Sequence, residues 1–121
     1  MNRHLILENQ ANKPYAASCS SEQFIRSVQD FLDLLTWGTE HGTDLYLLRD
    51  TNFTPEFFDL STGLAGEILQ KVSNYRQRLA IVGSFEMVTS KRFQEFMTES
   101  NKGTTVCFLR QQEKALRWLL S

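Results

Sequence analysis

The sequence of 121 residues lacks the features that identify several large classes of protein. It has two cysteines, Cys19 and Cys107, which are far apart and form no C-x-x-C pair. Their spacing argues against a zinc site or a disulfide framework and favours a reduced, cytoplasmic setting. No apolar run approaches the roughly 20 residues of a membrane-spanning helix, and the start, "MNRHLILENQ", lacks a secretory cleavage site.

An excess of charge of one sign is also absent, since 13 basic and 14 acidic side chains give a net charge of -1. Proteins that bind nucleic acids or membrane surfaces usually carry a basic excess, so we expect neither as a partner. The composition is that of a globular protein, with 41% hydrophobic residues and nine phenylalanines. We therefore expect a single domain over residues 1–121, with an aromatic core.

Short apolar runs alternate with longer amphipathic segments along the chain. The runs 4–9 and 14–19 flank the turn-prone "NQANK" and predict a β-hairpin. Ser20, with Gln23 three residues later, predicts the capped start of the first helix. The apolar patterns predict further strands at 44–50, 78–85 and 104–110, and helices at 20–38, 63–76, 90–103 and 112–120.

This alternation predicts an α/β fold with a single mixed sheet of four to five strands and about four helices. Strands that alternate with helices are joined by right-handed crossovers, which make the sheet mainly parallel. The N-terminal hairpin adds an antiparallel edge.

Polar residues follow the strands, where parallel sheets usually bind ligands. The loop after strand 44–50 is the longest, and the polar side chains of this and the next loops are Asp50, Asn52, Asp59, Ser61, Thr62, Ser84, Glu86, Ser90 and Arg110. No Ser/His/Asp or Cys/His set, metal-ligand spacing or phosphate-binding glycine motif is present. The sequence thus predicts no catalytic residue, no metal and no cofactor, although an enzyme is not excluded.

Two interpretations fit the segment Ser61, Thr62 and Gly63. Its residue types suit the capped start of a helix packed closely against the sheet, where Gly63 and Gly66 let the backbone approach a neighbour. The free N–H groups of a helix start also suit a phosphate or phosphoacceptor site.

The helix that follows carries a polar face, formed by Glu67, Gln70, Lys71 and Asn74. Glu67 and Lys71 are four residues apart and could form an ion pair on a solvated face. The same face could bind a partner, together with Tyr75 at the helix end. Glu99 and Asn101 end the next helix, where Asn101 also suits a helix C-terminus.

The segments "FFDLSTGLAGEILQKVSNYRQRLAIVGSF" and "FMTESNKG" resemble a bacterial family of domains of unknown function, numbered four-one-eight-zero. The resemblance covers nearly the whole chain and brings no established activity. It implies a central family motif formed by Phe58, Asp59, Thr62, Gly63, Gly66, Glu67, Gln70, Lys71, Asn74 and Tyr75. It also implies a second motif formed by Glu99, Ser100 and Asn101.

The order of elements is also similar to that of STAS domains, which include the anti-sigma factor antagonists. Those proteins carry an Asp-Ser-Ser-Gly-Leu-Gly turn whose second serine is phosphorylated by a partner kinase. Alignment on Gly63 implies Thr62 as the phosphoacceptor, with Ser61 before it. Leu60 stands at the place of the aspartate, Gly66 is one residue late, and "TNFTPEFF" separates the strand from the turn.

Two functional hypotheses follow. The first is a cytoplasmic STAS-like regulatory or protein-interaction module whose recognition surface lies around residues 58–75. Its partner would be another protein, or a second copy bound through exposed aromatics of "NFTPEFF". The second is a small-ligand or nucleotide-binding protein, possibly an enzyme, with a polar pocket lined by Asp59, Thr62, Glu67, Lys71 and Asn101.

Overall fold

The computed structural model describes residues 3–121 and contains one five-stranded sheet in the order β1-β2-β3-β4-β5. The hairpin of β1 (Leu5–Gln10) and β2 (Lys13–Ser18) is antiparallel. It is followed by β3 (Leu45–Arg49), β4 (Arg78–Val82) and β5 (Val106–Leu109), each parallel to the strand before it. The predicted α/β fold with a mainly parallel sheet and an antiparallel edge is confirmed.

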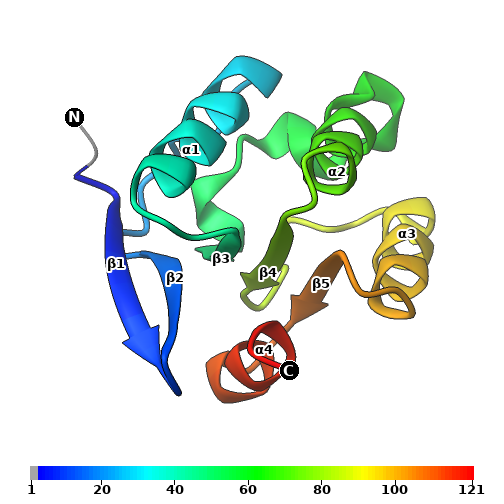
Figure 1. Ribbon diagram of the computed structural model, residues 1–121. Coiled ribbons are helices and arrows are strands. Elements are labelled where there is room, and N and C mark those ends of the chain that lie inside the picture. Colours follow the sequence, from blue (N-terminus) through cyan, green and yellow to red (C-terminus); the bar gives the residue numbers. More distant parts are fainter. Residues whose placement is uncertain (1–2) are drawn as a thin grey trace.

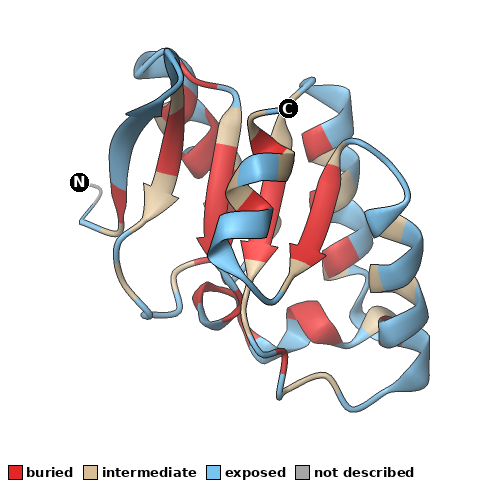
Figure 2. Cartoon of the chain, turned by 90° about the horizontal axis from the view of Figure 1, so that it is seen from below, coloured by how far each residue is buried: buried red, intermediate tan, exposed pale blue. Residues whose placement is uncertain are grey.

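The helices divide unequally between the two faces of the sheet (Figure 1). One face carries α1 (Val28–Glu40), α2 (Leu64–Asn74) and α3 (Lys91–Asn101), and the other carries α4 (Gln112–Leu119). The strands from β2 to β5 advance in one direction, so right-handed crossovers place their three connecting helices on the same side. Figure 2 shows the short α4 in front of the opposite side of the sheet. No helix within residues 3–121 is long and apolar enough to cross a membrane.

The main core lies between the sheet and α1–α3, and phenylalanine dominates it. Phe57 packs edge-on against Phe58 and Phe93, with ring centroids 5.0 and 6.0 Å away. Phe53, Phe57 and Phe58 are 2%, 0% and 6% exposed. Our prediction that the aromatics of "NFTPEFF" form an exposed dimerisation surface is therefore wrong. These residues run through the turns η1 (Asp50–Asn52) and η2 (Pro55–Phe58) and fill the core.

The first helix begins later than its sequence pattern predicts. Ser27, rather than Ser20, caps α1, and its Oγ accepts a hydrogen bond from the N–H of Asp30 at 3.1 Å. The preceding residues are not helical, and Ile25 forms a parallel bridge with Phe53. The N–H groups of Phe24 and Ile25 both donate to the carbonyl of Asn52, at 2.9 and 2.8 Å. These long-range bonds outweigh the local capping signal.

Asn52 fixes this junction with its side chain, which is fully buried. Its Oδ1 accepts from the N–H of Arg49 at 2.8 Å. Its Nδ2 donates to the carbonyls of Ser20 and Glu22, at 3.0 and 2.9 Å. One amide thus joins the end of β3 to the segment that enters α1.

We expect Asn52→Ala to lower the free energy of unfolding by about 3 kcal/mol or more, because three backbone groups lose their partners at a buried site. Urea unfolding followed by circular dichroism measures the change. Asn74→Ala, at an exposed position of α2, is the matched control and should change stability by less than about 0.5 kcal/mol. Equal losses in the two variants would contradict the role given to Asn52.

Candidate functional site

The turn at Ser61, Thr62 and Gly63 is held by its own side chains. Asp59 caps the short helix η3 (Leu60–Thr62), and its Oδ1 accepts from the N–H and Oγ of Ser61, at 3.0 and 2.7 Å. Thr62 Oγ1 lies 2.8 Å from the carbonyl of Glu56 and accepts from the N–H of Leu64 at 3.2 Å. Gly63 has φ 80°, a left-handed conformation that favours glycine, and α2 begins after it. The hydrogen bonds of this turn are therefore typical of a capped helix start, here the start of α2.

The hydrogen bonds to Asp59 also set its charge. The bond from the Ser61 hydroxyl and then that from the Ser61 N–H lower the pKa of the Asp59 carboxyl, and the charge of Arg92 adds to the effect. Hydrogen bonds to a carboxylate favour its charged form. The turn therefore presents a carboxylate beside two exposed hydroxyl-bearing residues, Ser61 and Thr62, at neutral pH.

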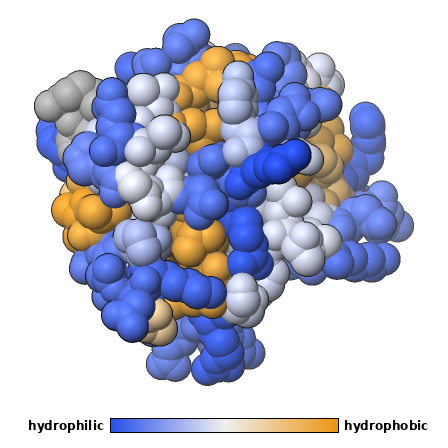
Figure 3. Space-filling model, viewed as in Figure 1, coloured by the Kyte–Doolittle hydropathy of each residue, from blue (hydrophilic) through white to orange (hydrophobic). Residues whose placement is uncertain are grey.

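The polar face of α2 makes few contacts with the rest of the protein. Within residues 3–121, the side chains of Glu67, Gln70, Lys71 and Asn74 form no hydrogen bond and no ion pair. Glu67 and Lys71 therefore do not form the pair that their spacing allows. Figure 3 shows mostly hydrophilic surface over this helix. Gly66 is exposed on the same helix.

At its C-terminal end, this surface meets a groove beside α1. Tyr75 is 57% exposed. Together with Leu32, Thr36 and Gln77 it lines a hollow of about 430 Å³ between the ends of the two helices. The Gln77 side chain donates to the carbonyl of Tyr75 at 2.7 Å, while its Oε1 is buried without a hydrogen-bond partner. The surface thus ends in an aromatic ring beside a partly apolar groove.

Two residues of the predicted surface have other places in the fold. Phe58 is a core residue, so its side chain is not available to a partner. Asn101 donates from Nδ2 to the carbonyl of Phe108 at 2.9 Å and accepts from the N–H of Phe108 at 2.7 Å. Since β5 is the last strand of the sheet, Asn101 occupies part of its hydrogen-bonding edge.

The two motif regions meet only in part. Ser73 of α2, with Glu99 and Ser100 of α3, lines a small hollow of about 220 Å³. Glu67, Lys71 and Asn101, which all lie within the described residues 3–121, do not line this hollow. Glu99 forms an ion pair with Lys102 at 3.3 Å. This hollow therefore does not include the Glu67, Lys71 and Asn101 side chains of the predicted polar pocket.

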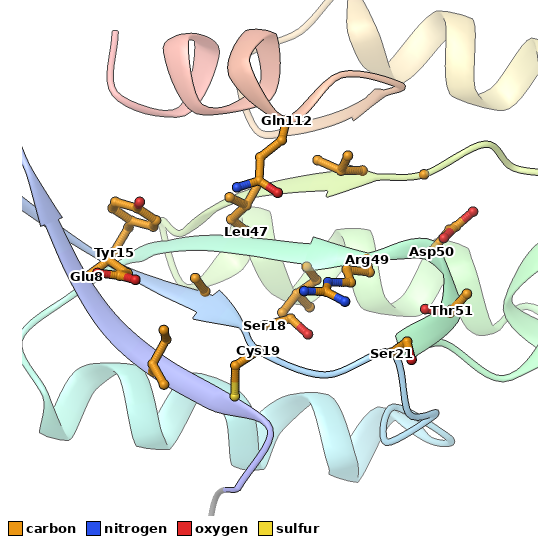
Figure 4. Close-up of a pocket in the computed structure, with 15 residues that line it drawn as sticks. Glu8, Tyr15, Ser18, Cys19, Ser21, Leu47, Arg49, Asp50, Thr51 and Gln112 are labelled. Atoms are coloured by element: carbon orange, nitrogen blue, oxygen red, sulfur yellow. The ribbon is translucent and has the colours of Figure 1, made fainter.

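A larger hollow of about 580 Å³ lies on the opposite face, at the carboxyl ends of β2, β3 and β4 (Figure 4). Of the loop residues that the sequence pattern selected, Asp50 alone lines it. Its polar side chains include Ser18, Arg49 and Thr51. The sequence pattern did not select Arg49, because the candidate residues were taken from the loops after the strands and Arg49 is the last residue of β3. The alternation of Leu45, Leu47 and Arg49 would have placed this arginine on the face of the sheet that α4 covers.

Across residues 3–121, no group of His, Cys, Asp and Glu side chains could hold a metal ion.

We expect Ser61→Ala to raise the pKa of Asp59 toward its ordinary value of 3.8, because the largest cause of its depression is removed. A carboxyl with a depressed pKa stabilises the fold above its unfolded pKa, and this contribution is lost as the pH falls through the folded pKa. The variant should thus lose stability at neutral pH, and the difference should shrink at acid pH. An NMR titration of the Asp59 carboxyl carbon measures the shift. Ser73→Ala is the control, and an unchanged Asp59 pKa in Ser61→Ala would contradict the assignment.

Asn101→Ala should lower the free energy of unfolding by about 1–3 kcal/mol, because both backbone groups of Phe108 lose their partner. Urea unfolding measures this loss, and sedimentation velocity should show more self-association through the uncovered β5 edge. Gln94→Ala, at an exposed position of the same helix, is the control. A loss no larger than that of the control would contradict the structural role of Asn101.

The fold is similar to that of a solved structure from Thermotoga maritima, described as a "putative anti-sigma factor antagonist" (tm1081). The TM-score is 0.52 at 12% sequence identity, over 98% of this chain and 97% of the other. The likeness shows a STAS-like fold, as the order of elements predicted.

No curated protein matches the sequence. A family model described as "Domain of unknown function (DUF4180)" matches residues 10–119. The match confirms the family resemblance of the two motif segments. The chain belongs to this family.

Proposed function

We propose that this chain is a small STAS-like regulatory or protein-interaction module. Its recognition surface, the α2 surface, comprises Asp59, Ser61, Thr62, Gly63, Gly66, Glu67, Gln70, Lys71, Asn74 and Tyr75. The observation that carries the proposal is that Glu67, Gln70, Lys71 and Asn74 hold no other part of the fold in place. Side chains with no structural bonds are available to bind a partner.

The chemistry of the α2 surface favours a folded protein as that partner. It combines the carboxylates of Asp59 and Glu67 with the ammonium group of Lys71, so neither sign of charge dominates. A polyanion such as a nucleic acid is usually bound by a basic patch instead. Exposed tyrosines such as Tyr75 are enriched at protein interfaces, where they supply both apolar area and a hydroxyl group.

The turn at the start of the α2 surface suits a phosphorylation switch. A phosphate would add about -1.5 to -2 charges beside the Asp59 carboxylate and the first turn of α2. The helix dipole would tolerate this charge, while an acidic partner surface would be repelled. Alignment with STAS domains selects Thr62, but its Oγ1 bonds to the backbone of the turn. Ser61 Oγ bonds to Asp59 alone and is the freer acceptor.

The alternative of a ligand pocket lined by Asp59, Thr62, Glu67, Lys71 and Asn101 has less support. Asn101 uses both ends of its amide on Phe108, which leaves the proposed ring of polar groups incomplete.

The proposal is tested by photocrosslinking of this chain to its partner in cells of the organism that produces it. A photoreactive amino acid at Gln70 should give a crosslinked protein of defined mass, because this position lies at the centre of the α2 surface. Alanine at Glu67, Lys71 and Asn74 together should reduce this product at least about tenfold, since hot-spot side chains carry most of the binding energy. Ser61→Glu should reduce it as well, through added negative charge.

The matched controls lie on α4, across the sheet. A photoreactive residue at Glu113 should not give the same product, and Glu113→Ala with Lys114→Ala should leave it unchanged. All these positions except the half-buried Lys71 are exposed, and alanine favours helix, so the variants should stay folded. Product of equal yield from Gln70 in the triple variant would count against the α2 surface.

A further inference from the structure

The hollow between the hairpin and α4 has the size of a small-molecule site. Its volume is about 580 Å³, within the range of roughly 300–1,000 Å³ that such sites occupy. It forms because α4 has eight residues and packs over β3, β4 and β5, which leaves the hairpin side of this face less covered. The α2 surface lies on the other side of the sheet, so the two do not share residues.

The lining separates into an apolar floor and a polar end. The floor consists of Ile6, Ala17, Leu47 and Val82, whose side chains project from four neighbouring strands. The polar end consists of Ser18, Ser21, Arg49 and Thr51, with Gln112 contributed by the start of α4. In Figure 4 the guanidinium group of Arg49 lies in the middle of the hollow, beside Ser18.

Arg49 is exposed to solvent, and its charge has no partner among the described residues. Within the part of the chain that the structure describes, its guanidinium group forms no hydrogen bond and no ion pair. Arg78, on the same face of the sheet, shows the contrast. Its guanidinium donates to the carbonyls of Thr104, Trp118 and Leu119 and stacks on the Trp118 ring at 4.3 Å. Protein groups thus bind one arginine of this face, while the other faces solvent and is available to a ligand.

The two acidic residues of the lining do not neutralise Arg49. The carboxylate of Asp50 accepts from the N–H of Phe85 at 2.9 Å and lies close against Gly83, where an added Cβ would clash with it. Figure 4 shows it turned away from Arg49. Glu8 lies toward the other end of the hollow, beside Tyr15. Burial and, second, the charge of Glu8 raise the pKa of Tyr15, as expected for neighbours.

We propose that this hollow binds a small organic carboxylate with an apolar body. The carboxylate would pair with the Arg49 guanidinium and the hydroxyl of Thr51, and the apolar body would cover Leu47 and Val82. Arginine binds carboxylates through two parallel N–H bonds. A single arginine near Asp50 and Glu8 favours a monoanion over a phosphate, whose second negative charge the two carboxylates would repel.

The test is an NMR titration of the ¹⁵N-labelled chain with hexanoate, followed through the backbone amide signals. We expect saturable shifts at Ala17, Leu47 and Val82. Arg49→Gln should weaken binding about tenfold or more, because it removes a charge-assisted hydrogen bond. Ala17→Ile fills the floor without changing charge and should also weaken binding. Arg117→Gln, which removes an exposed arginine outside the hollow, is the control and should bind as the original chain does.

Three further results would overturn the proposal. They are the absence of saturable shifts with hexanoate, equal binding by Arg49→Gln in a folded variant, and tighter binding of hexylamine or inorganic phosphate at the same amides. Hexylamine would indicate a cation site at Glu8 and Asp50, and phosphate an unspecific anion site. None of these results touches the α2 surface, whose crosslinking test does not use the hollow.

Discussion

The buried amide of Asn52 is the contact on which the first half of the structure depends. Its three hydrogen bonds join the end of β3 to residues 20–22, and the backbone carbonyl of the same residue holds Phe24 and Ile25 on a non-helical path. This path sets where α1 begins and allows Phe53, Phe57 and Phe58 to enter the core. Asp50, two residues earlier, ties the same edge to the loop after β4 through Phe85. Polar residues at the carboxyl edge, where ligands are expected, here hold neighbouring segments together.

The alternation of strands and helices was predictable because each element has its own local pattern. Short apolar runs and a turn-prone segment were enough for the hairpin, and helical spacing was enough for α2 to α4. The start of α1 was not predictable in the same way. Ser20 and Gln23 match a capping box, but the backbone of Phe24 and Ile25 bonds to Asn52, about thirty residues away in the chain. A local signal loses to such tertiary bonds, which no window of sequence contains.

The candidate site was predictable to a lesser degree. The turn at Ser61 to Gly63 has the cap and the left-handed glycine that its residues suggested. Phe58 and Asn101, by contrast, are residues of the family-like motifs that make contacts within the fold, one in the aromatic core and one on the β5 edge. A motif does not separate residues that bind from residues that fold. The sequence pattern did not select Arg49, because the hollow that it lines depends on the length of α4.

The division of the sheet into two unequal faces explains how one short chain can offer two different surfaces. Three helices cover one face, so the side chains accessible there are those that the helices turn outward. One helix covers the other face, so strand residues such as Ala17 and Leu47 themselves line a hollow. The two surfaces draw on different residues, and the packed sheet lies between them. Changes at distant sites without shared partners usually add in free energy, so binding at either surface should be separable by substitution. Residues 49–63, which run from Arg49 to the Ser61 turn, also link the two surfaces along the chain.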